Sequence, residues 1–257
     1  MTFLGTGTSS GVPMIGCTCA ICRSTDPRDK RLRPSIYIAV DGGAGILVDT
    51  TPDLRQQALT HSLARLDAVL FTHSHADHIL GLDEIRRFNF MQGAAIPCYA
   101  AEDVWQTIRR TFSYAFDGLE RQGGGIPRID VREIAGPFDV AGLHVVPVPL
   151  FHGKLPILGF RFGDFAYLTD CSAIPDASWP LVEGVETLVI DALREKKHST
   201  HFTVTEALEA IARIAPRRAY LTHMSHDLGH AETNARLPRG VELAYDGLSL
   251  DARVDAS

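Results

Sequence analysis

The sequence predicts a layered α/β domain with one or two β-sheets, and three observations support that prediction. Short apolar runs recur along the chain, with stretches of helical periodicity between them. Strand-type runs come first, helical stretches follow and strands return, which is typical of layered α/β domains. With 257 residues, 45% hydrophobic and 22% charged, the composition excludes a disordered chain, a coiled coil and a collagen-like repeat. Because no Pro- or Gly-rich run marks a boundary, we expect a single domain over residues 1–257.

Strands are expected wherever a short apolar run is bounded by turn residues. The first two expected strands flank an Asp-Gly-Gly turn at 41–43, which is a hairpin signal. The third runs directly into a cluster of histidines. In chain order the expected strands are 35–40, 45–49, 68–71, 143–148, 159–162, 165–168, 187–190, 219–221 and 241–245.

Helical periodicity predicts helices at 53–62, 102–111 and 203–214. At the start of the last helix, Thr203 and Glu206 have the spacing of a capping box, and Pro216 ends the helix. Residues 118–128 are Gly-rich and polar, so an exposed loop is expected there.

The net charge and the cysteine content limit the classes of protein to which this chain can belong. A net charge of −6 argues against a sequence-blind nucleic-acid binder, which usually carries a basic face. No segment approaches the roughly 20 apolar residues of a membrane helix, and the N-terminal residues lack the features of a signal peptide. Three of the five cysteines lie close together, at 17, 19 and 22, which favours metal binding in a reducing compartment over disulfides. We therefore expect a cytoplasmic protein with neither a membrane nor a nucleic acid as partner.

The strongest functional signal lies at residues 72–78, with the sequence THSHADH. Three imidazoles and a carboxylate cannot all be buried without partners, because unpaired buried polar groups cost on the order of several kcal/mol each. Neutral imidazole and carboxylate suit Zn²⁺, Mn²⁺ or Fe²⁺. The run follows an expected strand, and open α/β folds place ligands at that edge of the sheet. It therefore predicts a metal site, with a solvated polar turn as the alternative.

The same arrangement recurs at three later strand ends. His152 ends the strand at 145–151, Asp170 follows the strand at 165–168, and His223 follows the strand at 219–221. Taken alone, each is more commonly a surface, turn or cap residue. Repetition at four separate strands indicates one shared metal site.

These residues, in this order, resemble the metallo-β-lactamase fold hydrolases, and the resemblance covers nearly the whole chain. It implies an α/β fold of the αββα sandwich type, with two mixed β-sheets flanked by helices and a two-metal site at one edge. In such a site a hydroxide shared by two cations about 3.5–4 Å apart is a nucleophile at neutral pH. The resemblance implies that His73, His75 and His152 hold one metal, that Asp77, His78 and His223 hold the second, and that Asp170 bridges them.

The cysteine cluster supplies a second candidate metal site. Cys17, Cys19 and Cys22 offer three thiolates, one fewer than a four-ligand zinc site needs. The fourth ligand must lie elsewhere, and His226 is the best candidate. His230 is the competitor and is otherwise expected at the surface. Together with a histidine the cysteines would form a structural zinc site; the alternative is three buried apolar cysteines.

The combination of both motifs resembles the cyclic phosphodiesterases of phosphonate breakdown, the PhnP subgroup. The segment TGTSSGVP at 6–13 and the segment YDG at 245–247 also fit. The resemblance implies that His201 is an additional active-site histidine, which donates a proton to the departing alkoxide or binds a phosphate oxygen. The start of the helix that follows His201 is expected to add backbone donors for an anion. Asp77 is expected to orient the hydroxide as well as bind metal. His198 remains open between a loop residue and a site residue.

The sequence thus predicts a dinuclear-metal phosphodiesterase that uses a metal-bridged hydroxide. The resemblance implies that its substrate is a small cyclic or diester phosphate of the 5-phosphoribosyl 1,2-cyclic phosphate type. Its expected cofactors are two active-site ions, Mn²⁺ or Zn²⁺, and one structural Zn²⁺. The alternatives are a tRNA 3′-processing nuclease, a lactonase or thioester hydrolase, and a zinc-dependent binding protein without catalysis. A homodimer is the general expectation for an enzyme of this size.

Overall fold

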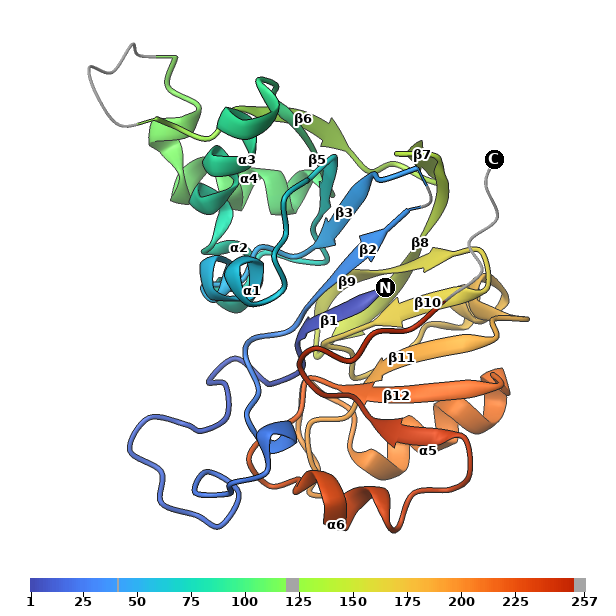
Figure 1. Cartoon of the computed structure of the whole chain (residues 1–257). Coiled ribbons are helices and arrows are strands. Elements are labelled where there is room, and N and C mark those ends of the chain that lie inside the picture. Colours follow the sequence, from blue (N-terminus) through green and yellow to red (C-terminus); the bar gives the residue numbers. More distant parts are fainter. Residues whose placement is uncertain (41, 119–124, 252–257) are drawn as a thin grey trace.

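The computed structural model describes residues 1–40, 42–118 and 125–251. Two β-sheets pack face to face, and helices cover both outer sides (Figure 1). This is the αββα sandwich that the sequence analysis expected. In the described part of the chain, no helix combines the length and the apolar character needed to cross a membrane.

The first sheet has six strands, whose spatial order follows the chain from β1 to β6. β1 to β3 pair antiparallel, and β3 to β6 pair parallel. The strands are β1 (Thr2–Gly5), β2 (Ser35–Ala39), β3 (Gly45–Val48), β4 (Ala68–Leu70), β5 (Ile96–Ala100) and β6 (Ile129–Glu133). The helices that follow these strands are α1 (Leu54–Thr60), α2 (Ala76–Ile79), α3 (Ile85–Gln92) and α4 (Glu102–Thr111), with short 3₁₀ helices at Pro27–Asp29, Leu82–Glu84 and Ser113–Ala115.

The second sheet has seven strands in the order β13-β12-β11-β10-β9-β8-β7. Its strands from β7 to β10 pair antiparallel, and those from β10 to β13 pair parallel. They are β7 (Phe138–Val140), β8 (Leu143–His152), β9 (Leu155–Phe162), β10 (Phe165–Leu168), β11 (Thr187–Asp191), β12 (Arg218–Thr222) and β13 (Val241–Leu243). The remaining helices are a 3₁₀ helix at Asp176–Val182, α5 (Val204–Ile214) and α6 (His230–Asn234).

Three apolar layers hold the sandwich together. The inner layer lies between the sheets, where Phe3 of β1 packs against Tyr220 of β12 with ring centroids 6.2 Å apart. One outer layer buries Trp105 of α4 against the first sheet, and the other buries Ala207 of α5 against the second. Strands such as β10 are therefore covered on both faces and are apolar throughout.

All nine expected strands and all three expected helices are present, with small differences at their ends. The sequence analysis gave no range for β1, β5, β6, β7, α2, α3 or α6. Pro97 lies inside β5, and a proline argues against a strand, while β6 is charged and only partly buried. The expected turn at 41–43 includes Asp41, and the expected loop at 118–128 includes residues 119–124. These positions lie outside the described residues.

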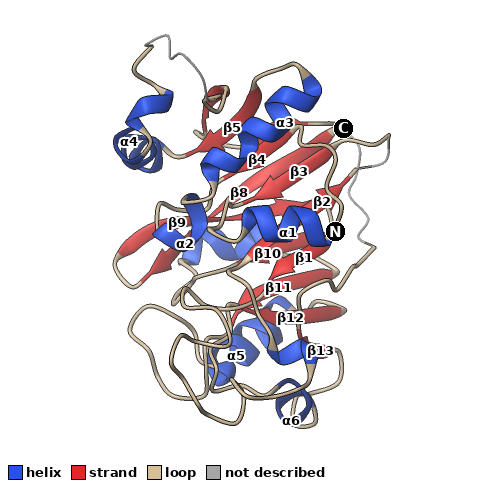
Figure 2. Ribbon diagram, turned by 60° about the vertical axis from the view of Figure 1, so that its left-hand side comes forward, coloured by secondary structure: helices blue, strands red, loops and turns tan. Residues whose placement is uncertain are grey.

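The topology brings strand ends from both sheets to one edge, seen in Figure 2 near α2. Three residues at this edge follow strands and adopt left-handed backbone angles: Asp49 (φ 65°), Asp170 (φ 57°) and His223 (φ 59°). This conformation costs a non-glycine residue about 1–3 kcal/mol, so it persists only where the surroundings enforce it. The turns redirect three polar side chains at the end of buried strands.

The capping box at the start of α5 provides a test of local stability. Thr203 accepts a hydrogen bond from the Glu206 backbone N–H at 3.1 Å, and the Glu206 carboxylate accepts one from the Thr203 N–H at 3.0 Å. We expect Thr203→Ala to lower the free energy of unfolding by about 1 kcal/mol, measured by urea titration. The control is Thr205→Ala at an exposed position of the same helix. Equal stability of the two variants would contradict this assignment.

Candidate active site

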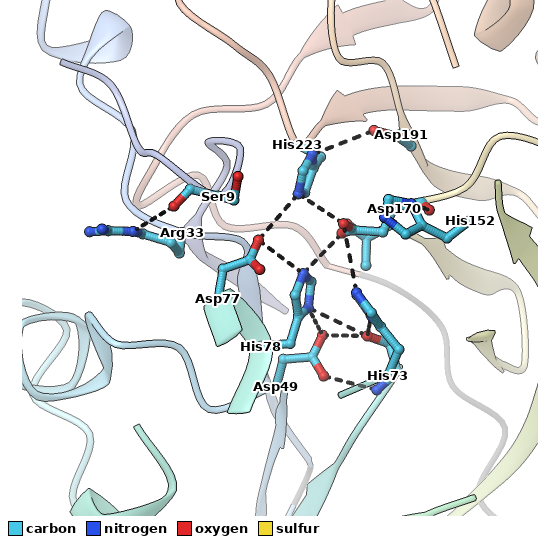
Figure 3. A network of polar contacts seen from close by, with 12 residues as sticks. Ser9, Arg33, Asp49, His73, Asp77, His78, His152, Asp170, Asp191 and His223 are labelled. Carbon is cyan, nitrogen blue, oxygen red and sulfur yellow. Dashed lines mark hydrogen bonds and ion pairs between the residues drawn. The ribbon is translucent and has the colours of Figure 1, made fainter. Parts of the chain in front are cut away.

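Two groups of metal-donor side chains meet where the edges of the two sheets come together (Figure 3). Within each group the donor atoms all lie within 4.8 Å of one another. The first group is His73, His75 and His152, and the second is Asp77, His78, Asp170 and His223. The structure thus brings together all seven residues for which the resemblance implied a metal-binding role.

The Asp170 carboxylate lies between the two groups. Its Oδ1 is 3.0 Å from His223 Nε2 and 4.0 Å from His73 Nε2, while its Oδ2 is 3.1 Å from His78 Nε2. Burial alone raises the pKa of Asp170, but the neighbouring His223 and His78 hold it well below its usual range. An ionised carboxylate in this position is suited to bridging two cations.

Hydrogen bonds fix which ring nitrogen of His73, His78 and His152 faces the site. His152 Nδ1 lies 2.8 Å from the carbonyl oxygen of Asp170. Because a carbonyl oxygen only accepts, Nδ1 carries the hydrogen, and Nε2 keeps its lone pair for a metal. This is the arrangement that metal-binding histidines usually have.

Asp49 performs the same task for two histidines of the first sheet. It accepts hydrogen bonds from the Thr72 backbone N–H (2.9 Å) and from the Thr72 hydroxyl (2.8 Å), and it lies 2.7 Å from His78 Nδ1. Since the Thr72 hydroxyl donates to Asp49, it accepts from His73 Nδ1 at 3.0 Å. His73 and His78 therefore both direct Nε2 towards the site.

The histidine nitrogens that face the site are placed to bind a metal. The Nε2 atoms of His73, His78 and His223 are buried; that of His73 has no hydrogen-bond partner among the described residues, and those of His78 and His223 contact only the carboxylates of Asp170 and Asp77. Leaving such atoms unpaired is costly, and a bound cation would remove the cost. Burial lowers the pKa of His73 well below its usual value, which favours the neutral imidazole that binds metal. Burial acts the same way on His78 and His223, but the neighbouring carboxylates, Asp170 first among them, outweigh it and raise their pKa values, so a cation would displace a proton there. His75 is exposed, so the first group is open to solvent on its side.

His201 lies against both groups of donors. Its ring centroid is 4.6 Å from that of His152 and 4.6 Å from that of His223. Its Nδ1 is 3.0 Å from the fully buried Asp191, which also accepts the Phe202 backbone N–H at 3.2 Å. Burial raises the pKa of Asp191 well above its usual range and lowers the pKa of His201 to about 3. With the shared proton on Asp191, His201 Nδ1 accepts and Nε2 carries a hydrogen.

Asp49, Asp191 and Thr72 are site residues that the sequence analysis missed. Each follows or ends a buried strand, β3, β11 or β4, and two of the three are acidic. The rule that singled out Asp170 would have found both aspartates had it been applied to every strand.

The start of α5 supplies at most one of the anion-binding amides that were expected. The Val204 N–H donates to the Arg194 carbonyl at 3.1 Å. The capping box occupies the N–H groups of Thr203 and Glu206. These three donors therefore already have partners within the protein, and the expectation of anion-binding amides stays a prediction only for the Thr205 N–H.

The cysteine cluster is assembled as predicted from the motif spacing. The Sγ atoms of Cys17, Cys19 and Cys22 lie 3.2, 3.5 and 3.5 Å from His226 Nδ1. A hydrogen bond from the Cys22 backbone N–H lowers the pKa of Cys19 to about 6, which favours the metal-binding thiolate. Three sulfurs and one nitrogen in this arrangement suit a tetrahedral zinc ion.

His230 is outside this cluster. Its side chain is 3% exposed, and its Nε2 lies 2.9 Å from the Asn234 side-chain nitrogen. The expectation of a surface residue was therefore wrong. The backbone N–H of His230 donates to Asp29, which fixes the start of α6.

Comparison with known proteins places the chain in a family. The family model described as a beta-lactamase superfamily domain matches residues 45–224. A solved structure of a new diphosphatase from the PhnP family is 43% identical, with a TM-score of 0.93, covering 100% of this chain and 98% of that one. The chain belongs to the beta-lactamase superfamily and, within it, to the PhnP family.

Two further similar proteins show how far the properties of relatives can be transferred to this chain. An octanoyltransferase of Porphyromonas gingivalis is 41% identical over 249 residues, which are 95% of this chain and 50% of the relative. The chain thus spans about half the length of this curated relative. Zn²⁺-bound PqqB from Methylobacterium extorquens has a TM-score of 0.78 at 21% identity, covering 98% and 99% of the two chains. That similarity shows the fold alone.

Cys19→Ser tests the structural zinc site. We expect loss of one zinc per chain and a destabilisation of at least about 2 kcal/mol, or roughly 4–8 °C in melting temperature. Metal analysis and thermal unfolding check both. Cys98→Ala, in the core of the first sheet, serves as the control that keeps its zinc. An unchanged melting temperature in Cys19→Ser would argue against a structural role.

Asp49→Asn tests the carboxylate that orients His73 and His78. Asn retains the size of the side chain but cannot accept all three hydrogen bonds. We expect metal affinity to fall about 10- to 100-fold with the fold intact, as measured by competition with a chelator. Unchanged affinity would show that the histidines are oriented without this carboxylate.

Proposed function

We propose that this protein is a metal-dependent phosphodiesterase that hydrolyses a small cyclic or diester phosphate. The family and the convergence of His and Asp donors support a metal-dependent hydrolase. The position of His201 against both donor groups, with Asp191 behind it, favours phosphate esters within that class.

The residues present fit two divalent cations. His73, His75 and His152 would hold one, Asp77, His78 and His223 the other, and Asp170 both. When bound, such ions acidify water into a nucleophile near neutral pH and neutralise charge on the attacked phosphate. His and Asp donors suit Mn²⁺, Zn²⁺ and Fe²⁺ alike. The cysteine cluster with His226 would hold a structural zinc.

Two side chains are placed to handle protons and phosphate oxygens. Asp77 Oδ2 is 3.4 Å from His78 Nε2 and 3.7 Å from His223 Nε2, which leaves Oδ1 to accept a hydrogen bond from the attacking water. His201 presents Nε2–H to a phosphate oxygen or to the departing alkoxide. Asp191 orients the His201 ring, and its proton passes to His201 Nδ1 when Nε2 gives its hydrogen to the alkoxide.

A diphosphate is the second candidate substrate, because the relative that is 43% identical over the full chain is described as a diphosphatase. Both reactions break a P–O bond next to the same donors. The octanoyltransferase name belongs to a relative of which this chain covers half, so it does not tell which half transfers the octanoyl group. A tRNA-processing nuclease would need a basic arm, whereas this sequence is acidic and has no such insertion.

The proposal is tested by parallel assays of the protein loaded with Mn²⁺ or Zn²⁺. The substrates are bis(4-nitrophenyl) phosphate, 4-nitrophenyl phosphate, a diphosphate and a lactone. We expect hydrolysis of the diester well above that of the monoester and the lactone. Cleavage of the lactone with the diester untouched would overturn the proposal and leave only the metal site.

His201→Ala separates phosphate chemistry from metal binding. We expect kcat for the diester to fall about 10²- to 10⁴-fold, the range for loss of a general acid, with metal content unchanged. Asp170→Ala is the contrasting variant, in which both turnover and active-site metal are lost. Loss of metal from His201→Ala would show that this residue is itself a ligand.

A further inference from the structure

Three of the metal-donor residues are preceded directly by a threonine. The pairs are Thr72 with His73, Thr169 with Asp170 and Thr222 with His223. The three threonines lie at or just after the ends of β4, β10 and β12, and each is at most 1% exposed. Burying a hydroxyl is costly unless it forms a hydrogen bond, and the Thr72 hydroxyl forms one with Asp49. The other two threonines differ from each other in this respect.

The Thr169 hydroxyl is bound to the carboxylate that lies between the two donor groups. Its Oγ1 is 2.9 Å from Asp170 Oδ2, and since an ionised carboxylate oxygen only accepts, the hydroxyl donates. Thr169 is fully buried, and a β-branched side chain has restricted freedom at χ1. The hydroxyl therefore cannot follow the carboxylate if the carboxylate rotates.

The two oxygens of Asp170 have different surroundings (Figure 3). Oδ1 is 3.0 Å from His223 Nε2 and 4.0 Å from His73 Nε2, so it faces a residue of each donor group. Oδ2 contacts His78 Nε2, at 3.1 Å, and the Thr169 hydroxyl. Holding Oδ2 in place keeps Oδ1 directed between the groups. The distance from Oδ1 to His73 is the longer one, so that side tolerates a rotation of the carboxylate least.

The histidines cannot hold the carboxylate in this way when cations are bound. Once His78 and His223 bind cations through Nε2, these nitrogens no longer carry a hydrogen for Asp170. The Asp170 backbone is fixed independently, because its carbonyl oxygen accepts from His152 Nδ1 at 2.8 Å. Among the described residues, the Thr169 hydroxyl is then the one side-chain donor left to the carboxylate.

Thr222 provides a matched comparison. It is as deeply buried as Thr169 and it also directly precedes a metal-donor residue. Its hydroxyl, however, has no hydrogen-bond partner in the described part of the chain. Replacement of Thr222 by Val therefore removes a buried hydroxyl beside the site without removing a hydrogen bond.

We propose that Thr169 is a positioning residue, whose hydroxyl holds Oδ2 of Asp170 so that Oδ1 serves both donor groups. Thr169 thereby sets the affinity for the ion of the group formed by His73, His75 and His152. This inference rests on the two-metal site of the proposed function and is independent of the substrate.

Thr169→Val tests the inference, because Val keeps the shape of the side chain and lacks the donor. We expect the affinity of the full chain for the Mn²⁺ ion of the first group to fall about 10- to 100-fold. The second group keeps Asp77, His78 and His223 and should retain its ion. In a titration with Mn²⁺, electron paramagnetic resonance should show the signal of an isolated ion over the range in which the wild type shows a coupled pair.

Three further variants separate the hydrogen bond from general effects on structure. Thr169→Ser keeps the hydroxyl and should restore both affinities to within about threefold of the wild type. Thr222→Val should bind the pair of ions as the wild type does. Thr169→Ala lacks the same hydroxyl and replaces Thr169→Val in the titration if thermal unfolding shows that the Val variant is not folded.

Several results would overturn the inference while the proposed function stands. One is wild-type affinity for both ions in Thr169→Val or Thr169→Ala. Another is an equal fall in affinity at the two donor groups, an equal loss in Thr222→Val, or a Thr169→Ser variant that is as impaired as Thr169→Val. If the wild type itself binds no pair of ions, the inference and the proposed function both fail.

Discussion

Buried imidazole nitrogens grouped around the Asp170 carboxylate are the constraint on which the rest of the structure depends. His73, His78 and His223 each direct a buried Nε2 into the same small volume. The Nε2 atoms of His78 and His223 lie 3.1 and 3.0 Å from the Asp170 carboxylate, and that of His73 lies 4.0 Å from it. The arrangement is stable if cations occupy it, and hydrogen bonds on the opposite ring nitrogens hold His73 and His78 ready.

The metal-donor residues come from both sheets, so the site lies where the two sheets of the sandwich meet. The turn after β4 and helix α2 contribute the 73–78 run, while the ends of β8, β10 and β12 contribute His152, Asp170 and His223. The N-terminal loop joins the same region, because Gly7 pairs with Met224 directly after His223. The cysteine cluster then ties that loop to His226, two residues further on. A structural zinc there would support the wall of the active site.

Much of the site could be predicted from the sequence, because the residues that can bind metal come directly after segments with the pattern of buried strands. Acids and imidazoles at the ends of apolar strands identify the edge of a sheet, and the motif order pointed to all seven donors. The positioning aspartates Asp49 and Asp191 were missed, since a single acid after a strand looks like an ordinary turn residue. Their role depends on burial and on partners 29 and 10 residues away in the chain. Strands β5 and β6 were missed for a similar reason. Pro97 in β5 and the exposed charges of β6 are unfavourable signals for a strand, but packing in the first sheet makes both segments strands.

Anomalous diffraction from crystals grown with Zn²⁺ or Mn²⁺ tests the central claim most directly, because it locates each ion independently of any activity. The account predicts two peaks on either side of the Asp170 carboxylate, one near His73 and one near His223. With Zn²⁺ it predicts a third peak among the three cysteines and His226. The absence of any peak at Asp170 in fully loaded protein would contradict the account.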